Sequence, residues 1–342
     1  MKQNLRSYVI NLIGMIGLYA AMLGLMSAGI LDRYYQGILM TVFINVILAV
    51  SLNLTTGLLG QIALGHAGFM SIGAYTAALL TKALAETLST ASPLASGAIL
   101  LVALLLGGIT AALFGLLIGG PVLRLKGDYL AIITLGFGEI IRVVIENLHF
   151  TGGAQGLRGI ERMASLPMTF WITAVVVVLL FTLGRSRHGR AIISISQDEI
   201  ASEAAGIHNT YYKIMAFTIA AFFAGIAGGI YAHYIGSLTA KTFGFNKSID
   251  ILVIVVFGGM GSLTGSIVAA VGLTILPELL REVLGDFTEY RMLLYAVALV
   301  IVMLFKPSGL FGRYEFSLTR VVDRLTGKGP KKSKRKEDAV HE

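Results

Sequence analysis

The sequence of 342 residues contains no cysteine, a single tryptophan, six prolines and only 13% charged residues. The absence of cysteine excludes disulfides, thiolate nucleophiles and cysteine-based metal sites. The low content of charged residues excludes the surface of an ordinary soluble domain, which carries about 25% charged residues. Much of this chain must therefore face a solvent other than water.

Motifs for catalysis and nucleotide binding are missing as well. No G-x-x-x-x-G-K-[ST] stretch occurs, because Gly327 and Lys328 are followed by Gly329, so the chain cannot hold ATP phosphates as a P-loop does. The six histidines show no metal-binding spacing such as H-E-x-x-H, and no G-x-S-x-G nucleophile motif is present. We expect no enzyme activity, no metal site and no cofactor bound by this chain itself.

Long apolar segments dominate what is present. The chain is 56% hydrophobic with a mean hydropathy of +0.80, and its continuous apolar runs reach the roughly 20 residues that span a bilayer as a helix. Alternating ten-residue segments, which are typical of a membrane β-barrel, are absent. The run over 8–30 is too long for the apolar region of a signal peptide. The sequence predicts an all-α, polytopic integral membrane protein.

Charges between these runs predict the topology. The loop over about 184–210 contains Arg185, Arg187 and Arg190 and is expected to be cytoplasmic, as is the N-terminus with Lys2 and Arg6. Residues 306–342 hold ten Lys or Arg against five acids, which indicates a cytoplasmic C-terminus. We expect a permease domain over 1–312 and a disordered basic tail over 313–342, which contacts anionic lipid rather than nucleic acid.

Two glycine-rich stretches interrupt the apolar runs. The run over 249–280 contains the stretch from Gly258 to Gly265. Because the loop over 184–210 and the C-terminus are both expected to be cytoplasmic, the chain between them must cross the membrane an even number of times, which requires that this run be two passes. The sequence thus predicts about ten transmembrane helices, some of them short or broken. Polar groups beside the stretch over 55–68 must face a helix interface or a cavity. The candidate pathway or hinge residues are Asn53, Gly57, Gly60, Gln61, Gly65, His66, Gly258, Gly259 and Gly261; close packing of helices is the alternative role of the glycines.

Three charged residues, Glu139, Arg142 and Glu146, follow i, i+3, i+7 spacing and share one face of a predicted helix. An unpaired charge in the bilayer costs roughly 2.5–3.5 kcal/mol on insertion scales, so mutual ion pairing near the outer interface is expected. A proton relay in an ion-coupled carrier is the alternative function of these acids.

The segment from Ser196 to Ile207 is polar and lies between apolar runs. Ser196 and Glu199 have the spacing of a capping box, and Gly206 can end the helix, which predicts a helix of two to three turns. Ile200, Ala201, Ala204 and Ile207 form an apolar stripe beside Glu199 and Glu203. Such a helix fits a groove on a partner protein; an ordinary capped loop is the alternative.

The chain resembles the LivM-type membrane subunit of bacterial branched-chain amino-acid ABC transporters from about residue 35 to 312; its first apolar run begins at about residue 8, whereas some members carry a long N-terminal extension. The stretches that carry the resemblance are Leu52–Asn53–Leu54 with Leu64–Gly65–His66–Ala67 and Ile72–Gly73–Ala74–Tyr75; Gly127–Asp128–Tyr129 with Glu139–Ile140; Thr151–Gly152–Gly153; the block from Gly189 to His233; Gly258–Gly259–Met260–Gly261–Ser262; and Lys306–Pro307 with Gly309–Leu310.

The resemblance implies the function and the partners. It implies a permease subunit in the bacterial inner membrane, forming half of an alternating-access pathway for Leu, Ile or Val, with a LivH-type second permease, two ATP-binding subunits that use ATP and Mg, and an extracytoplasmic solute-binding protein. It also implies that Asp198, Glu199, Ile200, Glu203, Ala204, Ala205, Gly206 and Ile207 form the helix that couples to an ATPase. Related permeases carry urea, amides or other amino acids, and an ion-coupled secondary transporter is a further alternative.

Overall fold

The computed structural model describes residues 2–29, 31–87, 93–125, 127–284, 291–306, 308–312 and 314–315. Within these ranges the chain is almost entirely helical, as predicted. The helices are α1 (Lys2–Ser27), α2 (Arg33–Asn53), α3 (His66–Thr87), α4 (Pro93–Val122), α5 (Asp128–Asn147), α6 (Leu166–Arg185), α7 (Arg187–Gln197), α8 (Glu199–Ala204), α9 (Asn209–Ile235), α10 (Phe245–Gly258), α11 (Leu263–Leu284) and α12 (Arg291–Phe305). The predicted tail lies outside the described residues, apart from 314–315.

The N-terminal 31 residues and residues 32–315 fall in two different compact units. In the first unit, α1 exposes apolar side chains such as Ile13 and Leu18, as a helix in contact with lipid does. The second unit contains α2 to α12 and all the candidate site residues.

Five helical segments in the described ranges are long and apolar enough to cross a membrane: 33–58, 96–122, 166–185, 209–235 and 263–281. This confirms a polytopic membrane protein. The two helices α7 and α8 have 11 and six residues, too few to cross about 30 Å of hydrocarbon. The total of ten crossings and the cytoplasmic position of both termini stay predictions.

The helices α3, α4 and α9 pack directly on one another in the second unit. Glycines make this close packing possible: a Cβ on Gly73 would lie 2.2 Å from the backbone of Gly225, and a Cβ on Gly228 would lie 1.9 Å from the Met70 carbonyl oxygen. Such small-residue contacts replace the hydrophobic driving force that is weak between helices in lipid. This part of the unit is therefore a tightly packed helical core.

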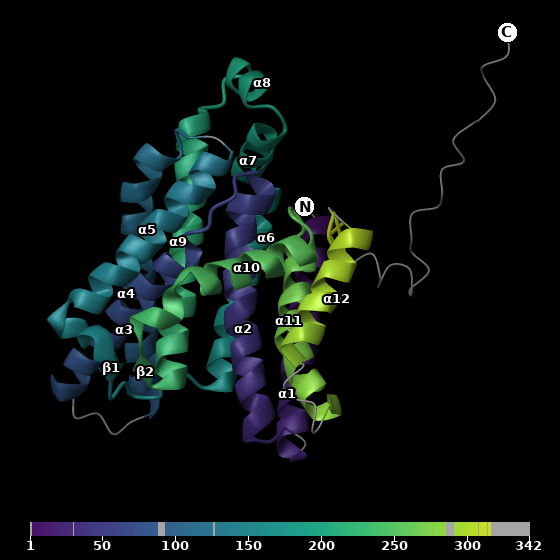
Figure 1. Cartoon of the computed structure of the whole chain (residues 1–342). Coiled ribbons are helices and arrows are strands. Elements are labelled where there is room, and N and C mark those ends of the chain that lie inside the picture. Colours follow the sequence, from purple (N-terminus) through teal and green to yellow (C-terminus); the bar gives the residue numbers. More distant parts are fainter. Residues whose placement is uncertain are drawn as a thin grey trace, which may run out of the picture. The chain divides into compact units, whose positions relative to one another are not determined.

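Short elements lie at the two ends of the second unit. Figure 1 shows α7 and α8 at one end and the two-stranded sheet of β1 (Leu157–Arg158) and β2 (Ser237–Leu238) at the opposite end. The strands are antiparallel, with Leu157 opposite Leu238. A 3-10 helix, η4 (Ala240–Phe243), leads from β2 to α10.

Both predicted interruptions are present, and one differs in detail from expectation. The run over 249–280 divides into α10 and α11 around Gly259, which confirms the predicted break. The interruption predicted over 55–68 is shorter in the structure, because only residues 59–65 are not helical and α3 begins at His66. The preceding turn is a π-helix, η1 (Leu54–Leu58), a form that is rare and often found at functional sites.

Candidate functional site

The polar loop after α6, predicted over about 184–210, contains two helices, and the first of them, α7, was not predicted from the sequence. In α7, Ser186 is the N-cap and accepts a hydrogen bond from the Gly189 amide at 3.1 Å. Ile192 and Ile195 are buried, while Arg187 and Arg190 on the same helix are exposed. The amphipathic α7 therefore lies on the body of the protein with its charged side exposed.

The following helix, α8, is shorter than predicted and has a different cap. Asp198 is the N-cap, and its Oδ1 accepts hydrogen bonds from the amides of Ile200 at 2.9 Å and Ala201 at 3.0 Å. The predicted capping box at Ser196 is wrong, because Ser196 is still in α7 and its hydroxyl donates to the Ile193 carbonyl. The predicted two to three turns shrink to six residues.

Gly206 ends α8, as predicted. It adopts a φ of +85°, its amide donates to the Glu203 carbonyl at 2.9 Å, and the next amide, that of Ile207, donates to the Ser202 carbonyl at 3.1 Å. These bonds occupy carbonyls that a helix end would leave free. The short helix is thus closed at both ends, although it has fewer residues than an isolated helix needs.

The outer side of α8 is an exposed knob, defined here as Ile200, Ala201, Glu203, Ala204 and Ala205. All five are exposed, and Ile200 is 80% accessible. Figure 1 shows α8 as the most peripheral element at its end of the unit. Ile207 does not extend the predicted stripe, because it is half-buried and packs on the core.

The inner side of α8 is fastened to α9 by two contacts to Glu199. The Lys213 Nζ lies 2.6 Å from the Glu199 Oε1, with side-chain exposures of 5% and 31%. The Asn209 side-chain amide donates to the Glu199 carbonyl oxygen at 2.7 Å. Sequence reasoning missed Lys213; the available signal was a lone lysine near the start of a long apolar helix, which needs an acidic partner.

The second feature of the site is the break between α10 and α11. The fully buried Asn53 donates to the Ser262 carbonyl and the Ser266 hydroxyl, both at 2.8 Å, and accepts from the Gly261 amide at 2.9 Å. A Cβ on Gly57 would lie 1.6 Å from the Asn53 Oδ1. Asn53 and Gly57 thus join the end of α2 to the break.

Residues 308–312 and 315 contact the ends of α10 and α11 at the break. The amides of Leu310 and Phe311 donate to the last carbonyls of α10, those of Phe257 and Gly258. The Glu315 carboxylate accepts from the Leu263 amide at 2.6 Å, which satisfies a free donor at the start of α11. Gly259 has a φ of +111°, and a Cβ there would lie 2.6 Å from the Gly312 carbonyl oxygen. The glycines Gly258, Gly259 and Gly261 therefore have a packing role, whereas hinge motion stays a prediction.

The third feature is the irregular segment over 59–65. At Gly60, with a φ of +74°, a Cβ would lie 3.1 Å from the Cβ of Ser196 in α7. At Gly65, a Cβ would lie 2.3 Å from the Thr134 carbonyl oxygen in α5. The Gln61 side-chain oxygen is buried without a hydrogen-bond partner among the described residues. The segment thus contacts both α5 and α7.

His66 begins α3 and is buried, with its Nε2 2.9 Å from the Ser51 hydroxyl oxygen. This contact joins α3 to α2. It gives His66 a structural role, and a role in the translocation pathway stays a prediction.

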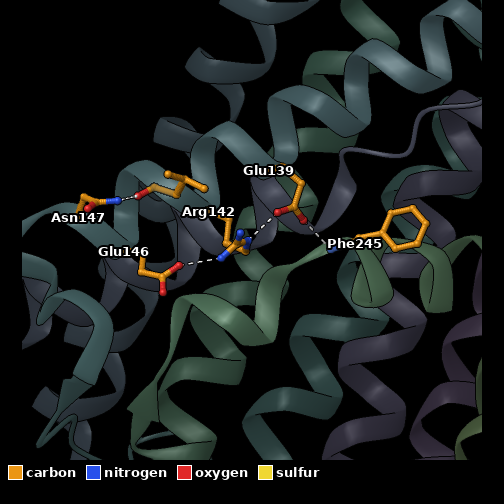
Figure 2. A network of polar contacts seen from close by, with 6 residues as sticks. Glu139, Arg142, Glu146, Asn147 and Phe245 are labelled. Carbon is orange, nitrogen blue, oxygen red and sulfur yellow. Dashed lines mark hydrogen bonds and ion pairs between the residues drawn. The ribbon is translucent and has the colours of Figure 1, made fainter.

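The predicted ion pairing in α5 is present. Figure 2 shows Arg142 between the two glutamates, with its Nε 2.6 Å from Glu139 and its Nη1 2.7 Å from Glu146. Glu139 also accepts a hydrogen bond from the Phe245 amide at 2.8 Å, which connects α5 to the start of α10. The cation is thus shared by two carboxylates. A cavity of about 360 Å³ lies beside these residues.

Comparison with known proteins identifies the family. A family model described as "Branched-chain amino acid transport system / permease component" matches residues 34–303. The chain belongs to this family. It is 38% identical over 302 residues to the high-affinity branched-chain amino acid transport system permease protein LivM of Salmonella typhimurium and 37% identical to LivM of Escherichia coli, with 78% of this chain and 67% of each relative covered.

A weaker similarity connects this permease to a second relative. It is 27% identical over 155 residues to the permease protein LivH of Escherichia coli, covering 45% of this chain and 49% of that protein. No solved structure matches the chain. Family membership together with the apolar helices makes this permease a multi-pass protein of the bacterial inner membrane.

Proposed function

We propose that this permease forms half of the translocation pathway of an ABC importer for branched-chain amino acids. The relatives named LivM and LivH are permease proteins of high-affinity branched-chain amino acid transport systems. A system with two kinds of permease supports pairing of this chain with a LivH-type subunit. Two ATP-binding subunits that use ATP and Mg, and an extracytoplasmic solute-binding protein, complete the proposed complex.

The observation that carries the proposal is the form of α8. An isoleucine that is 80% exposed on a water-facing helix leaves apolar surface for a partner to cover. The helix is also held rigidly, by Asp198 at its start, Gly206 at its end and the pair with Lys213 on its inner side. A fixed knob transmits a displacement of its partner to α9, as a coupling helix must. Its groove would be on an ATP-binding subunit.

The ion-coupled carrier has less support from the site. Both candidate acids, Glu139 and Glu146, share the guanidinium of Arg142 and so have a structural role as partners in its ion pairs. Reconstitution in liposomes separates the two functions: an ABC permease requires internal ATP and its partners, whereas a carrier works alone with an ion gradient. Leucine uptake by the isolated chain under a gradient would refute the proposal.

The charge reversal Glu203→Lys tests α8 directly. Glu203 is exposed on the knob and lies outside the Lys213 contact, so the fold should be preserved. We expect the ATP-binding subunits to be lost on purification and leucine uptake to fall at least tenfold. The matched control is Glu161→Lys, an exposed acid in the loop before α6. Unchanged uptake and complex yield in Glu203→Lys would show that the knob is not the docking surface.

A further inference from the structure

The cavity of about 360 Å³ beside the α5 ion pairs is formed where η4 leads into α10. Its volume lies at the lower end of the range for small-molecule sites, about 300–1,000 Å³. Two of its lining residues, Lys241 and Thr242, belong to η4, which directly follows β2 at the end of the unit opposite α8 (Figure 1). In the proposed topology this is the extracytoplasmic side, from which an imported solute arrives.

The lining of the cavity contains charges of both signs. Glu139 and Arg142 come from α5, Lys241 from η4, and Lys247 from the first turn of α10. The α10 helix has 14 residues and begins at the cavity, so the positive end of its dipole adds to the two lysines. Short helices that begin within a membrane protein commonly direct this end at anionic groups of a substrate.

Unused hydrogen-bonding capacity remains on both sides of the cavity. The Glu139 Oε2 accepts one hydrogen bond from Arg142, and the Glu139 Oε1 accepts one from the Phe245 amide. A carboxylate oxygen can accept two hydrogen bonds, so each has one position left. The Lys247 ammonium has three donors and makes one contact of 3.3 Å, to the Asn45 side-chain oxygen. Lys241 makes no hydrogen bond through its ammonium within the part of the chain that the structure describes, and it is exposed.

We propose that this cavity binds the zwitterionic head of an α-amino acid, with the carboxylate on Lys241, Lys247 and the start of α10 and the ammonium on Glu139. Phe245 supplies exposed apolar surface beside the head group for an aliphatic side chain. A neutral solute such as urea or an amide can form hydrogen bonds here but brings no formal charge to pair with either side. The inference rests on the proposed import of amino acids and adds the residues that recognise the shared part of the cargo.

The test measures binding directly, without ATP. In the assembled complex, Trp171→Phe removes the one natural tryptophan of this chain, and Phe245→Trp places a fluorophore at the cavity. We expect leucine to change its fluorescence, while leucinamide, which lacks the carboxylate, and isovalerate, which lacks the ammonium, half-saturate at concentrations at least about tenfold higher, as expected for loss of a charge-assisted hydrogen bond. Equal binding of leucine and leucinamide, or no leucine response in a complex that still imports leucine, would overturn the proposal.

Two lysine substitutions assign the carboxylate side. In this reporter background, Lys241→Met and Lys247→Met are each expected to weaken leucine binding by about 10- to 100-fold, and to raise the KM of uptake more than they lower its maximal rate. Lys82→Met, an exposed lysine of α3 that does not line the cavity, is the control. If both cavity variants bind like this control, the assignment is wrong. Failure of ATP-driven uptake in the parent complex would instead refute the proposed function, because the binding titration requires no ATP.

Discussion

The ion pair between Lys213 and Glu199 determines how firmly α8 is held on α9. The two charged atoms are 2.6 Å apart, with Lys213 5% and Glu199 31% exposed. Lys213→Met removes the cation and keeps a long apolar stem in place. A charge-assisted hydrogen bond contributes about 1.5–3 kcal/mol. Because the released carboxylate still reaches water, we expect the lower part of this range, about 1.5–2 kcal/mol, to be lost from the free energy that opens α8.

The opposite substitution, Glu199→Ala, should be more damaging. It leaves the ammonium of Lys213 buried without its counter-charge, and breaking a buried pair from one side costs about 3–5 kcal/mol. The double variant Lys213→Met with Glu199→Ala leaves neither charge buried. Its loss of stability at α8 should therefore be smaller than the sum of the two single losses. This asymmetry follows only from the unequal burial of the two partners.

Hydrogen–deuterium exchange of residues 199–206 in the membrane-embedded permease measures the opening of α8. Lys213→Met should accelerate exchange by about 10- to 30-fold, at one factor of ten per 1.4 kcal/mol, and Glu199→Ala should accelerate it further. Arg187→Met, which removes an exposed cation from neighbouring α7, is the control and should have no effect. If Glu199→Ala exchanges no faster than Lys213→Met, or if the control matches them, the pair does not hold α8.

Two further substitutions test the break between α10 and α11. Asn53→Leu removes three hydrogen bonds and takes away the Asn53 partner of the Gly261 amide, so we expect about 1–3 kcal/mol less stability and a lower Tm of the purified complex than in the exposed control Asn147→Leu; an unchanged Tm would contradict this bridge. Gly259→Leu introduces a β-carbon at a φ of +111° and 2.6 Å from the Gly312 carbonyl oxygen, so leucine turnover should fall while the ATP-binding subunits still co-purify. At Gly272 in α11 a Cβ would meet no atom within 4 Å, so Gly272→Leu is the control. Normal leucine turnover in Gly259→Leu would show that this break has no role in transport.

Features of the fold that depend on local sequence could be predicted. The split of the run over 249–280 followed from a glycine cluster and an even count of crossings, and the pairing of Glu139, Arg142 and Glu146 followed from helical spacing. The glycine cluster and the three charges each lie within about two turns of helix, and only the count of crossings uses charges elsewhere in the chain. The end of α8 at Gly206 belongs to the same class, because a glycine that adopts a positive φ is a local signal.

Features that depend on distant partners could not be predicted. Ser196 and Asp198 are both good N-cap residues, and the choice between them depends on where α7 ends, which is set by the packing of Ile192 and Ile195 on the core. Asn53 lies more than 200 residues from its partners Ser262 and Ser266. No periodicity in the chain indicates that these two segments meet.

The contacts of Ser196 and Asn53 explain why a displacement of α8 should be felt at both interruptions. Ser196, at the end of α7 next to α8, lies so close to Gly60 that a β-carbon on Gly60 would be 3.1 Å from the Ser196 Cβ. Asn53, one turn before Gly57, is hydrogen-bonded to the break between α10 and α11. Close-packed contacts of this kind transmit movement because they cannot be compressed. Lys213→Met loosens the element that receives the force, whereas Gly259→Leu stiffens the element that must respond. The first should therefore alter exchange at α8 without altering the break, and the second should block turnover with α8 unchanged.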